Sequence, residues 1–511
     1  MEIKLLILLG LLISTRKTMP PLYYQMPKGL NSLYLIKMFS TFSYSILYSS
    51  LLLYLVQELG LPQALANSIV GVFLAVNFSL HLLGGFIGGR LISNRFLFLI
   101  GILSKIIGIF LLNNNNVSAF YLGISFFLLG SGLTVTCITC MITQRFSADD
   151  NRRETAFFMS YCAMNIGFLA GFIVSGYFDF KTSYMPLFQI SNLTNISSII
   201  LMLYSWRSTK DMDTPLSRLN SLDSRKKFFF GITLVALLIP LIFYSLHYSS
   251  LSNELILSLG FSMLFLIFIL ANKPVNTQSK NKIYAFLILT IASIAFWMVY
   301  YTGPMGLTLF IKHNVDAQFL GLPIAPQWIY NINAVVIIIG SPLLAVFFSK
   351  LRAGNYSVSL TIQFSFALIL IAMAYTCLSI GIHYADSHGL THLNWLVLCI
   401  ILKSLGELFI APVGYAMIGK LAPSNLQGIM MGTWMAASGI AATLSHFCSN
   451  MMTKSNTIDP FLTNAHYFNT FEKLSAVAFL FGIILLFFSS KIEKLISSPV
   501  TEHMDRAIEA V

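Results

Sequence analysis

The chain of 511 residues is 56% hydrophobic and only 10% charged, and it carries a formal net charge of +12. Soluble proteins carry about 25% charged residues, so this composition excludes a water-soluble fold and indicates a chain that faces lipid. The positive charges are spread over short segments between apolar runs rather than gathered in one basic arm, which argues against a nucleic-acid-binding protein.

The first segment, residues 1–30, is predicted to be an N-terminal extension. Its apolar run from Leu5 to Ser14 is too short to cross a bilayer, because a spanning helix needs about 20 residues. The run resembles the hydrophobic part of a signal peptide, but the basic residues after it and the absence of a small-residue cleavage site argue against its removal. The alternative is that Met19 or Met26 is the true start.

Fourteen apolar segments are long enough to cross a bilayer as helices. They are too long and too continuous to be the strands of a transmembrane barrel. We therefore expect an all-α integral membrane protein. In chain order the predicted spans are residues 34–56, 65–88, 94–113, 117–143, 155–176, 184–206, 228–248, 252–271, 283–311, 325–349, 355–384, 393–419, 427–451 and 470–490.

Lys and Arg residues are concentrated in every second connection between these spans. Because cytoplasmic loops are enriched in basic residues, both termini are predicted to be cytoplasmic, which requires an even number of spans, and fourteen is even. The longest basic linker, residues 207–227, follows the sixth span, and two further spans precede the last six. This layout predicts six-helix bundles at residues 31–207 and 283–492, joined by linkers and two extra helices in residues 208–282, and a cytoplasmic tail at residues 493–511.

Five ionisable side chains inside predicted spans are candidates for a function: Lys37, Lys105, Lys403, Glu407 and His81. A charge at the bilayer centre costs about 2.5–3.5 kcal/mol on insertion scales, so such residues usually face a bundle interior or a water-filled cavity. Each also has a structural explanation. Lys403 and Glu407 lie four residues apart on one helix and can neutralise each other. Lys37 can extend to the interface, Lys105 can bond carbonyls at a helix end, and His81 can be a core residue.

Four stretches carry motifs that resemble those of one family. They are LGELFIAPVGYAMIGKLAPSNLQGIMMGTW (residues 405–434), RRETAFFMSYCAMNIG (152–167), NINAVVIIIGSP (331–342) and FWMVYYTGPMGLTLF (296–310). They resemble, respectively, the tenth and eleventh, the fifth, the eighth and the seventh helices of the proton-dependent oligopeptide transporter family. This family belongs to the major facilitator superfamily, and the resemblance extends over about residues 30–495. It implies the major facilitator fold with two six-helix bundles and two extra helices between them.

The resemblance implies a secondary active transporter that moves di- and tripeptides, or peptide-like solutes, by alternating access and proton coupling. By this resemblance Glu407 would hold the α-amine of a peptide, Asn165 and Asn333 would bond its backbone, and Trp434 would shape a side-chain pocket. The chemistry agrees, because an ammonium prefers a carboxylate and peptide groups pair with side-chain amides that both donate and accept. The remaining substrate-binding candidates are Tyr161, Tyr44, Lys37 and Tyr301.

The first helix departs from the family pattern. Where the family has E-x-x-E-R, this chain has Lys37, Ser40 and Thr41 in place of the two Glu residues and the Arg. Tyr48 stands in place of a second Arg, and Val135 in place of the usual Lys of the fourth helix. Four further positions also differ from the family pattern, namely Phe78, His81, Gly89 and Tyr301.

Two hypotheses follow from these departures. The proton pathway is either lost, which would leave a facilitator or exchanger, or rerouted through a Lys403–Glu407 switch. The candidates for coupling and gating are Glu407, Lys403, Lys37, His81 and Lys105. The usual cations for a peptide carboxylate are also missing, so either Lys37 replaces them or the substrate lacks a free carboxylate.

Other functions remain open on the same scaffold, above all transport of a different amine-bearing solute. A membrane enzyme or sensor is disfavoured, because no nucleophile–base pair is visible. No metal or cofactor is expected, since Cys137 and Cys140 lack the second pair of ligands that a zinc site needs. The abundance of Asn, Ile and Lys suggests an AT-rich bacterial genome, and hence an inner (plasma) membrane and a lipid bilayer as surroundings.

Overall fold

The computed structural model describes residues 26–496 except 115, 148–149, 151, 213, 273–276, 354–357, 423–425 and 455–456. The predicted N-terminal extension therefore lies outside the described residues up to residue 25, and the predicted tail from residue 497. The same holds for residues 423–425 of the motif that joins the tenth and eleventh predicted helices of the resemblance.

Within the described residues, thirteen of the fourteen predicted spans each fall on one long helix, and residues 283–311 fall on α10, η5 and α11, which confirms the all-α prediction. The helices are α2 (Leu30–Leu53), extended by η3 (Tyr54–Glu58), α3 (Gln63–Ile87), α4 (Asn94–Leu112), α5 (Val117–Thr143), α6 (Arg152–Phe180), α7 (Tyr184–Tyr204), η4 (Pro215–Arg218), α8 (Ser221–His247), α9 (Ser249–Ala271), α10 (Thr277–Tyr300), η5 (Gly303–Leu307), α11 (Thr308–His313), α12 (Pro326–Ala353), α13 (Leu360–His383), α14 (Leu393–Leu421), α15 (Gln427–Met452) and α16 (Pro460–Ile496).

Thirteen spans of the described chain are long and apolar enough to cross a membrane. The remaining long helix, α15, is less apolar because it lies in the interior, where Ser445, His446 and Ser449 are buried. It packs against α3, α9 and α10. A helix that turns its polar residues toward neighbouring helices needs an apolar surface only on its outer side, so the lower hydropathy of α15 agrees with its packing.

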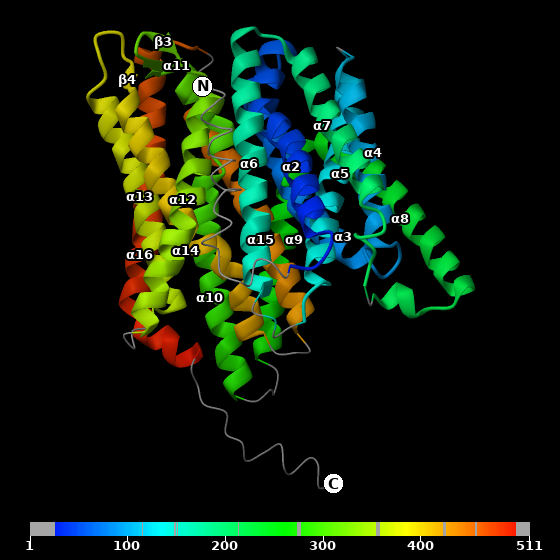
Figure 1. Ribbon diagram of the computed structural model, residues 1–511. Coiled ribbons are helices and arrows are strands. Elements are labelled where there is room, and N and C mark those ends of the chain that lie inside the picture. Colours follow the sequence, from blue (N-terminus) through cyan, green and yellow to red (C-terminus); the bar gives the residue numbers. More distant parts are fainter. Residues whose placement is uncertain are drawn as a thin grey trace, which may run out of the picture.

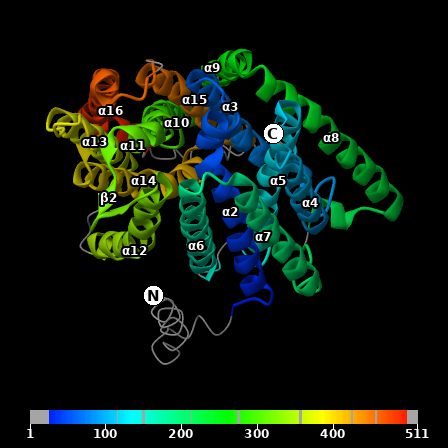
Figure 2. The ribbon, with the colours of Figure 1, turned by 90° about the horizontal axis from the view of Figure 1, so that it is seen from above.

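The long helices form two bundles, seen side by side in Figure 1 and from above in Figure 2. In the first bundle, α4 packs on α5 and α7, and α2 packs on α6 and α7. In the second, α13 packs on α14 and α16, and α10 packs on α15. The bundles meet where α3 contacts α15 and where α6 contacts α12. This arrangement confirms the predicted fold of two six-helix bundles, while the residue boundaries of the domains remain predictions.

The two extra helices, α8 and α9, lie beside the bundles, with α8 at the periphery in Figure 2. Helix α9 contacts α3 of the first bundle and α15 of the second, and α8 contacts α5 and α3. The Asn253 side chain of α9 donates to Ser68 Oγ of α3 at 3.0 Å. The outer face of α8 exposes Phe229, Leu237 and Leu241, as expected for a face in contact with lipid acyl chains.

The seventh predicted bundle helix, residues 283–311, is interrupted rather than continuous. Helix α10 ends at Tyr300, and a five-residue π turn, η5, precedes the short helix α11. Met305, within η5, has the non-helical angles φ −120° and ψ −119°. The carbonyl of Gly303 accepts hydrogen bonds from Tyr330 Oη at 2.6 Å and from Thr308 Oγ1 at 2.8 Å, so side chains satisfy the backbone at the break.

Four short strands cap one end of the second bundle, at the top of Figure 1. β1 (Val315–Asp316) pairs in parallel with β4 (Thr391–His392). β2 (Gln318–Phe319) and β3 (Leu322–Pro323) form a small antiparallel hairpin. These strands lie in connections that the charge pattern predicts to be extracytoplasmic.

Candidate functional site

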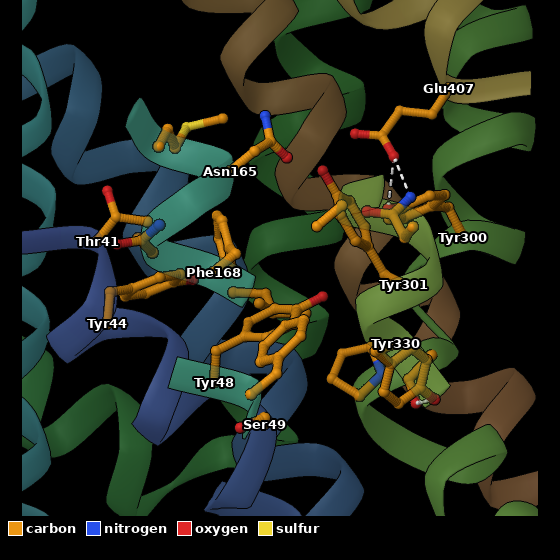
Figure 3. Close-up of a pocket in the computed structure, with 18 of the residues that line it drawn as sticks. Thr41, Tyr44, Tyr48, Ser49, Asn165, Phe168, Tyr300, Tyr301, Tyr330 and Glu407 are labelled. Atoms are coloured by element: carbon orange, nitrogen blue, oxygen red, sulfur yellow. Dashed lines mark hydrogen bonds between the residues drawn. The ribbon is translucent and has the colours of Figure 1, made fainter. Parts of the chain in front are cut away.

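A cavity of about 280 Å³ lies between the two bundles. The first bundle lines it with residues of α2, α3, α5 and α6, and the second with residues of α10, η5, α11, α12 and α14. Figure 3 shows part of this lining, with aromatic side chains on both walls and a carboxylate on one of them. The cavity therefore sits where each bundle can contact the same bound molecule.

Glu407 of α14 supplies that carboxylate. Its Oε2 accepts hydrogen bonds from Tyr300 Oη at 2.7 Å and from Asn333 Nδ2 at 2.8 Å, drawn as dashed lines in Figure 3. Asn333 also donates to Ser404 Oγ at 2.9 Å, which fixes the amide. Among the described residues, no side chain donates to Glu407 Oε1. One carboxylate oxygen is thus held in place while the other is available to a ligand.

Lys403 lies one helical turn before Glu407 and also lines the cavity. The two side chains do not form an ion pair within 4.0 Å in the described part of the chain. Instead, Lys403 Nζ lies 4.2 Å from the centre of the Tyr300 ring and 5.9 Å from that of Tyr330. The ammonium is therefore held mainly by cation–π contact, and the self-neutralising pair considered from the sequence is not formed.

The first bundle presents an uncharged wall built from aromatic rings. The rings of Tyr44 and Phe168 are 6.2 Å apart, and those of Tyr48 and Phe172 are 6.3 Å apart. Edge and offset contacts of this kind stabilise aromatic clusters. Phe172 continues across the cavity to Tyr330 of the second bundle, at 6.4 Å. The substituted positions Ser40, Thr41, Tyr48 and Val135 all line this wall.

The structure brings most of the predicted site residues together. The predicted residues that line the cavity are Glu407, Asn165, Asn333, Tyr161, Tyr44, Tyr301, Lys403 and His81. Three others do not line it, namely Lys37, Lys105 and Trp434. Their predicted roles in binding or coupling remain predictions. In this structure their side chains do not reach the cavity in which a bound molecule would lie.

Lys37 and Trp434 are each engaged elsewhere. Lys37 Nζ donates to Ser160 Oγ of α6 at 2.8 Å, which ties α2 to α6. The Trp434 ring of α15 packs closely over Gly414 of α14, where a β-carbon would collide with it. Because of these contacts, neither Lys37 nor Trp434 lines the cavity.

Lys105 is fully buried in the first bundle. Its Nζ donates to the Ser40 carbonyl of α2 at 2.9 Å and lies 5.4 Å from the centre of the Phe127 ring. The sequence allows a bond from this lysine to a carbonyl at a helix end, whereas the Ser40 carbonyl lies in the middle of α2. Because Ser40 lines the cavity, the contact also supports the cavity wall from behind.

We expect Lys105→Met to retain transport within about twofold and to leave thermal stability unchanged or higher. Replacing a buried charge by an apolar side chain of similar volume is often neutral or stabilising. Lys105→Ala is expected to lose about 2–5 kcal/mol, because it leaves a void. Thermal unfolding and uptake measured together check this: a Lys105→Met protein that is stable but inactive would instead make Lys105 part of the coupling pathway.

Sequence reasoning missed two residues that organise the site, Tyr300 and Tyr330. Tyr300 holds Glu407, and Tyr330 bonds the broken helix at Gly303. A signal for Tyr330 is present, because it precedes Asn333 by three residues and so shares its helix face. Tyr300 directly precedes Tyr301 in the sequence, and both line the cavity because the helix ends there.

We expect Tyr300→Phe to raise the substrate concentration for half-maximal uptake about tenfold. The change removes one hydrogen bond to a carboxylate, worth about 1.5–3 kcal/mol, and keeps the ring that contacts Lys403. Tyr284→Phe is the matched control, because the Tyr284 hydroxyl bonds Asn272 outside the cavity at 2.7 Å. Concentration dependence of uptake checks the prediction, and equal behaviour of the two variants would contradict it.

Polar contacts join the two bundles at the end that carries the starts of α3 and α12. Lys312 Nζ forms an ion pair with Asp179 at 2.9 Å. Trp328 Nε1 donates to the Ile173 carbonyl at 2.9 Å. At the α3–α15 contact, Asn67 donates to Asn450 at 3.0 Å. The charge pattern predicts this end to be extracytoplasmic, so the three contacts hold the bundles together on that side.

The fold and the central cavity define a multi-pass membrane transporter of the major facilitator type. Residues 96–474 match the POT family, and the chain belongs to that family. A relative in Pectobacterium carotovorum subsp. carotovorum, the dipeptide and tripeptide permease A, is 24% identical over 484 residues, which cover 94% of each chain.

Solved structures that share the fold include two with a bound molecule. A peptide transporter POT in complex with sulfate has a TM-score of 0.79 and 22% identity, over 92% of this chain and 96% of that one. A POT family transporter in complex with 5-aminolevulinic acid has a TM-score of 0.79 and 22% identity, over 91% of this chain and 99% of that one. At these identities the likeness concerns the fold.

Proposed function

We propose that this chain carries di- and tripeptides, or peptide-like solutes, across the membrane by alternating access. The observation that carries the proposal is Glu407, a carboxylate with one oxygen available, in a cavity that both bundles line. A desolvated ammonium binds best to such a group. The name of the relative, dipeptide and tripeptide permease A, supports a peptide as the ammonium-bearing solute.

The side-chain amides of the cavity suit a peptide backbone. Asn165 Nδ2 donates to the Tyr161 carbonyl at 3.0 Å, and Asn333 Nδ2 donates to Glu407 and Ser404. The Oδ1 atoms of both residues accept no hydrogen bond from the described chain, so each can accept one from a peptide N–H. The aromatic wall opposite Glu407 makes apolar contacts that do not depend on one particular side chain, as transport of varied peptides requires.

Proton coupling is the further part of the proposal. Glu407 is the single carboxylate among the described residues that line the cavity, so it is the residue that would exchange its charge with a proton there. Lys403, one turn away, would respond to that change through the shared Tyr300 ring. The transporter is proposed to act inward in a bacterial inner membrane, with both termini in the cytoplasm, as the charge pattern predicts.

One observation favours a second candidate substrate. A structural relative binds 5-aminolevulinic acid, which carries an amine and a carboxylate but no peptide bond. The Glu407 carboxylate would accept such an amine equally well, and an uncoupled facilitator or exchanger of amine-bearing solutes would use the same cavity.

Uptake into proteoliposomes tests this function. Labelled alanyl-alanine and labelled 5-aminolevulinic acid are offered with and without an inward proton gradient. We expect alanyl-alanine to accumulate above its external concentration only with the gradient. Equilibration that ignores the gradient would contradict proton coupling, and uptake of 5-aminolevulinic acid alone would replace the peptide by the second candidate.

A further inference from the structure

Lys403 is the single Lys or Arg among the described residues that line the cavity. Only 4% of its surface is exposed. Within the described chain, its ammonium makes no hydrogen bond and no ion pair. A buried cation without an anion is costly, and contact with the Tyr300 and Tyr330 rings offsets only part of that cost.

The break in the seventh bundle helix makes room for this ammonium. A β-carbon at Gly303 would lie 2.8 Å from Lys403 Nζ, so the glycine at the start of the π turn allows the ammonium to sit against the backbone. Gly303 and Tyr330 both line the cavity, and the Tyr330 hydroxyl donates to the Gly303 carbonyl where the helix is interrupted. The ammonium is therefore placed by the fold, at the edge of the cavity.

The other candidate cations are occupied or remote. Lys37 is bonded to Ser160, and Lys105 to the Ser40 carbonyl, and neither lines the cavity. On the first bundle's wall, the positions Thr41 and Val135 are uncharged. An anionic group of a bound molecule therefore finds its one fixed positive partner on α14, next to Glu407.

The spacing of the two charges sets a length. Four residues of an α-helix rise about 6 Å, which is the axial separation of the Lys403 and Glu407 backbones, and two residues of an extended chain span at most about 7 Å. The Tyr300 side chain separates the charges, because its ring faces Lys403 Nζ and its hydroxyl bonds Glu407 Oε2. A dipeptide that lies along the Tyr300 side chain can reach both charges, with its ammonium at Glu407 and its carboxylate at Lys403.

We propose that Lys403 binds the carboxylate of the substrate, so that α14 alone holds both charged ends and selects dipeptide-length zwitterions. This inference rests on the proposed peptide transport. The side chains of such a substrate then face the aromatic wall of Tyr48 and Phe168, which needs no cation. This arrangement explains why the first helix can lack the charged residues of the family motif, because the second bundle binds both charged ends of the substrate.

Competition for alanyl-alanine counterflow tests the proposal. The competitors are alanyl-alanine, its C-terminal amide and trialanine, and the proteins are the wild type, Lys403→Gln, Lys403→Arg and the control Lys473→Gln on the exposed face of α16. We expect the wild type and the control to prefer the free dipeptide at least about tenfold over both other competitors. Lys403→Gln should weaken binding of the free dipeptide by that factor and keep binding of the amide within about threefold of the wild type. Lys403→Arg should recover the preference for the free dipeptide.

Three results would overturn the proposal. If Lys403→Gln still prefers the free dipeptide over its amide, the substrate carboxylate is bound elsewhere. If the affinity for both dipeptides falls equally, Lys403 has a purely structural role. Trialanine that competes as well as alanyl-alanine in the wild type overturns the spacing argument. Absence of wild-type counterflow would instead remove the proposed function, and this inference with it, so the two failures are distinguishable.

Discussion

Replacing Glu407 by Gln is expected to weaken dipeptide binding and counterflow at least about 100-fold. The substitution keeps the shape of the side chain and an oxygen for Asn333 and Tyr300, but it removes the negative charge that faces the substrate ammonium. Losing one partner of a desolvated, hydrogen-bonded charge pair costs about 2–5 kcal/mol, and 100-fold corresponds to about 2.7 kcal/mol. The effect is large because no other carboxylate lines the cavity among the described residues.

Counterflow of labelled alanyl-alanine without a proton gradient measures this effect free of coupling. Glu472→Gln, on the exposed face of α16, is the matched control and should behave as the wild type. Size-exclusion profiles of both variants check that folding is intact. Counterflow by Glu407→Gln within about threefold of the wild type would show that the ammonium is bound elsewhere.

Lys312→Met is expected to destabilise the protein by about 3–5 kcal/mol and to lower transport at least about tenfold. The substitution leaves the Asp179 side chain, only 4% exposed, without its cation. A buried charge that loses its partner is strongly destabilising. Asp179→Asn should cost less, because the remaining Lys312 side chain is 23% exposed and can be hydrated. Transport falls because this pair joins the bundles at the predicted extracytoplasmic end.

The double variant Asp179→Asn with Lys312→Met distinguishes the energy of the ion pair from the effects of the two single substitutions. Since neither charge is then left unpaired, we expect it to recover most of the stability lost in Lys312→Met. Thermal unfolding of the four proteins gives the coupling, and counterflow shows whether activity follows. Additive losses in the double variant would mean that the ion pair does not join the bundles in the functional protein.

The helices could be predicted from the sequence because lipid requires long apolar runs, but their local geometry could not. Helix α16 extends beyond the predicted residues 470–490 at both ends, since polar residues outside the lipid continue a helix without an apolar signal. The interruption after Tyr300 was missed for a related reason: Gly303 and Pro304 are tolerated in a continuous transmembrane helix as well as in a broken one.

The part of the candidate site that could be predicted from the sequence is the set of polar residues that lie in recognisable motifs. Glu407, Asn165 and Asn333 were named from their motifs, and the cavity unites them. Lys403 shows the limit, because the spacing of four residues allows an ion pair that the structure replaces by the Tyr300 ring. The role of Lys37 near the substrate stays a prediction; in the structure its long side chain reaches Ser160 on another helix, a contact that no local pattern encodes.

We infer that the cavity between the bundles binds small peptides by their ammonium group for transport. The decisive experiment is counterflow of labelled alanyl-alanine in proteoliposomes, challenged with excess unlabelled alanyl-alanine or N-acetyl-alanyl-alanine. We expect counterflow that the free dipeptide suppresses and the N-acetylated dipeptide does not. Absence of counterflow, or equal suppression by both compounds, would contradict it.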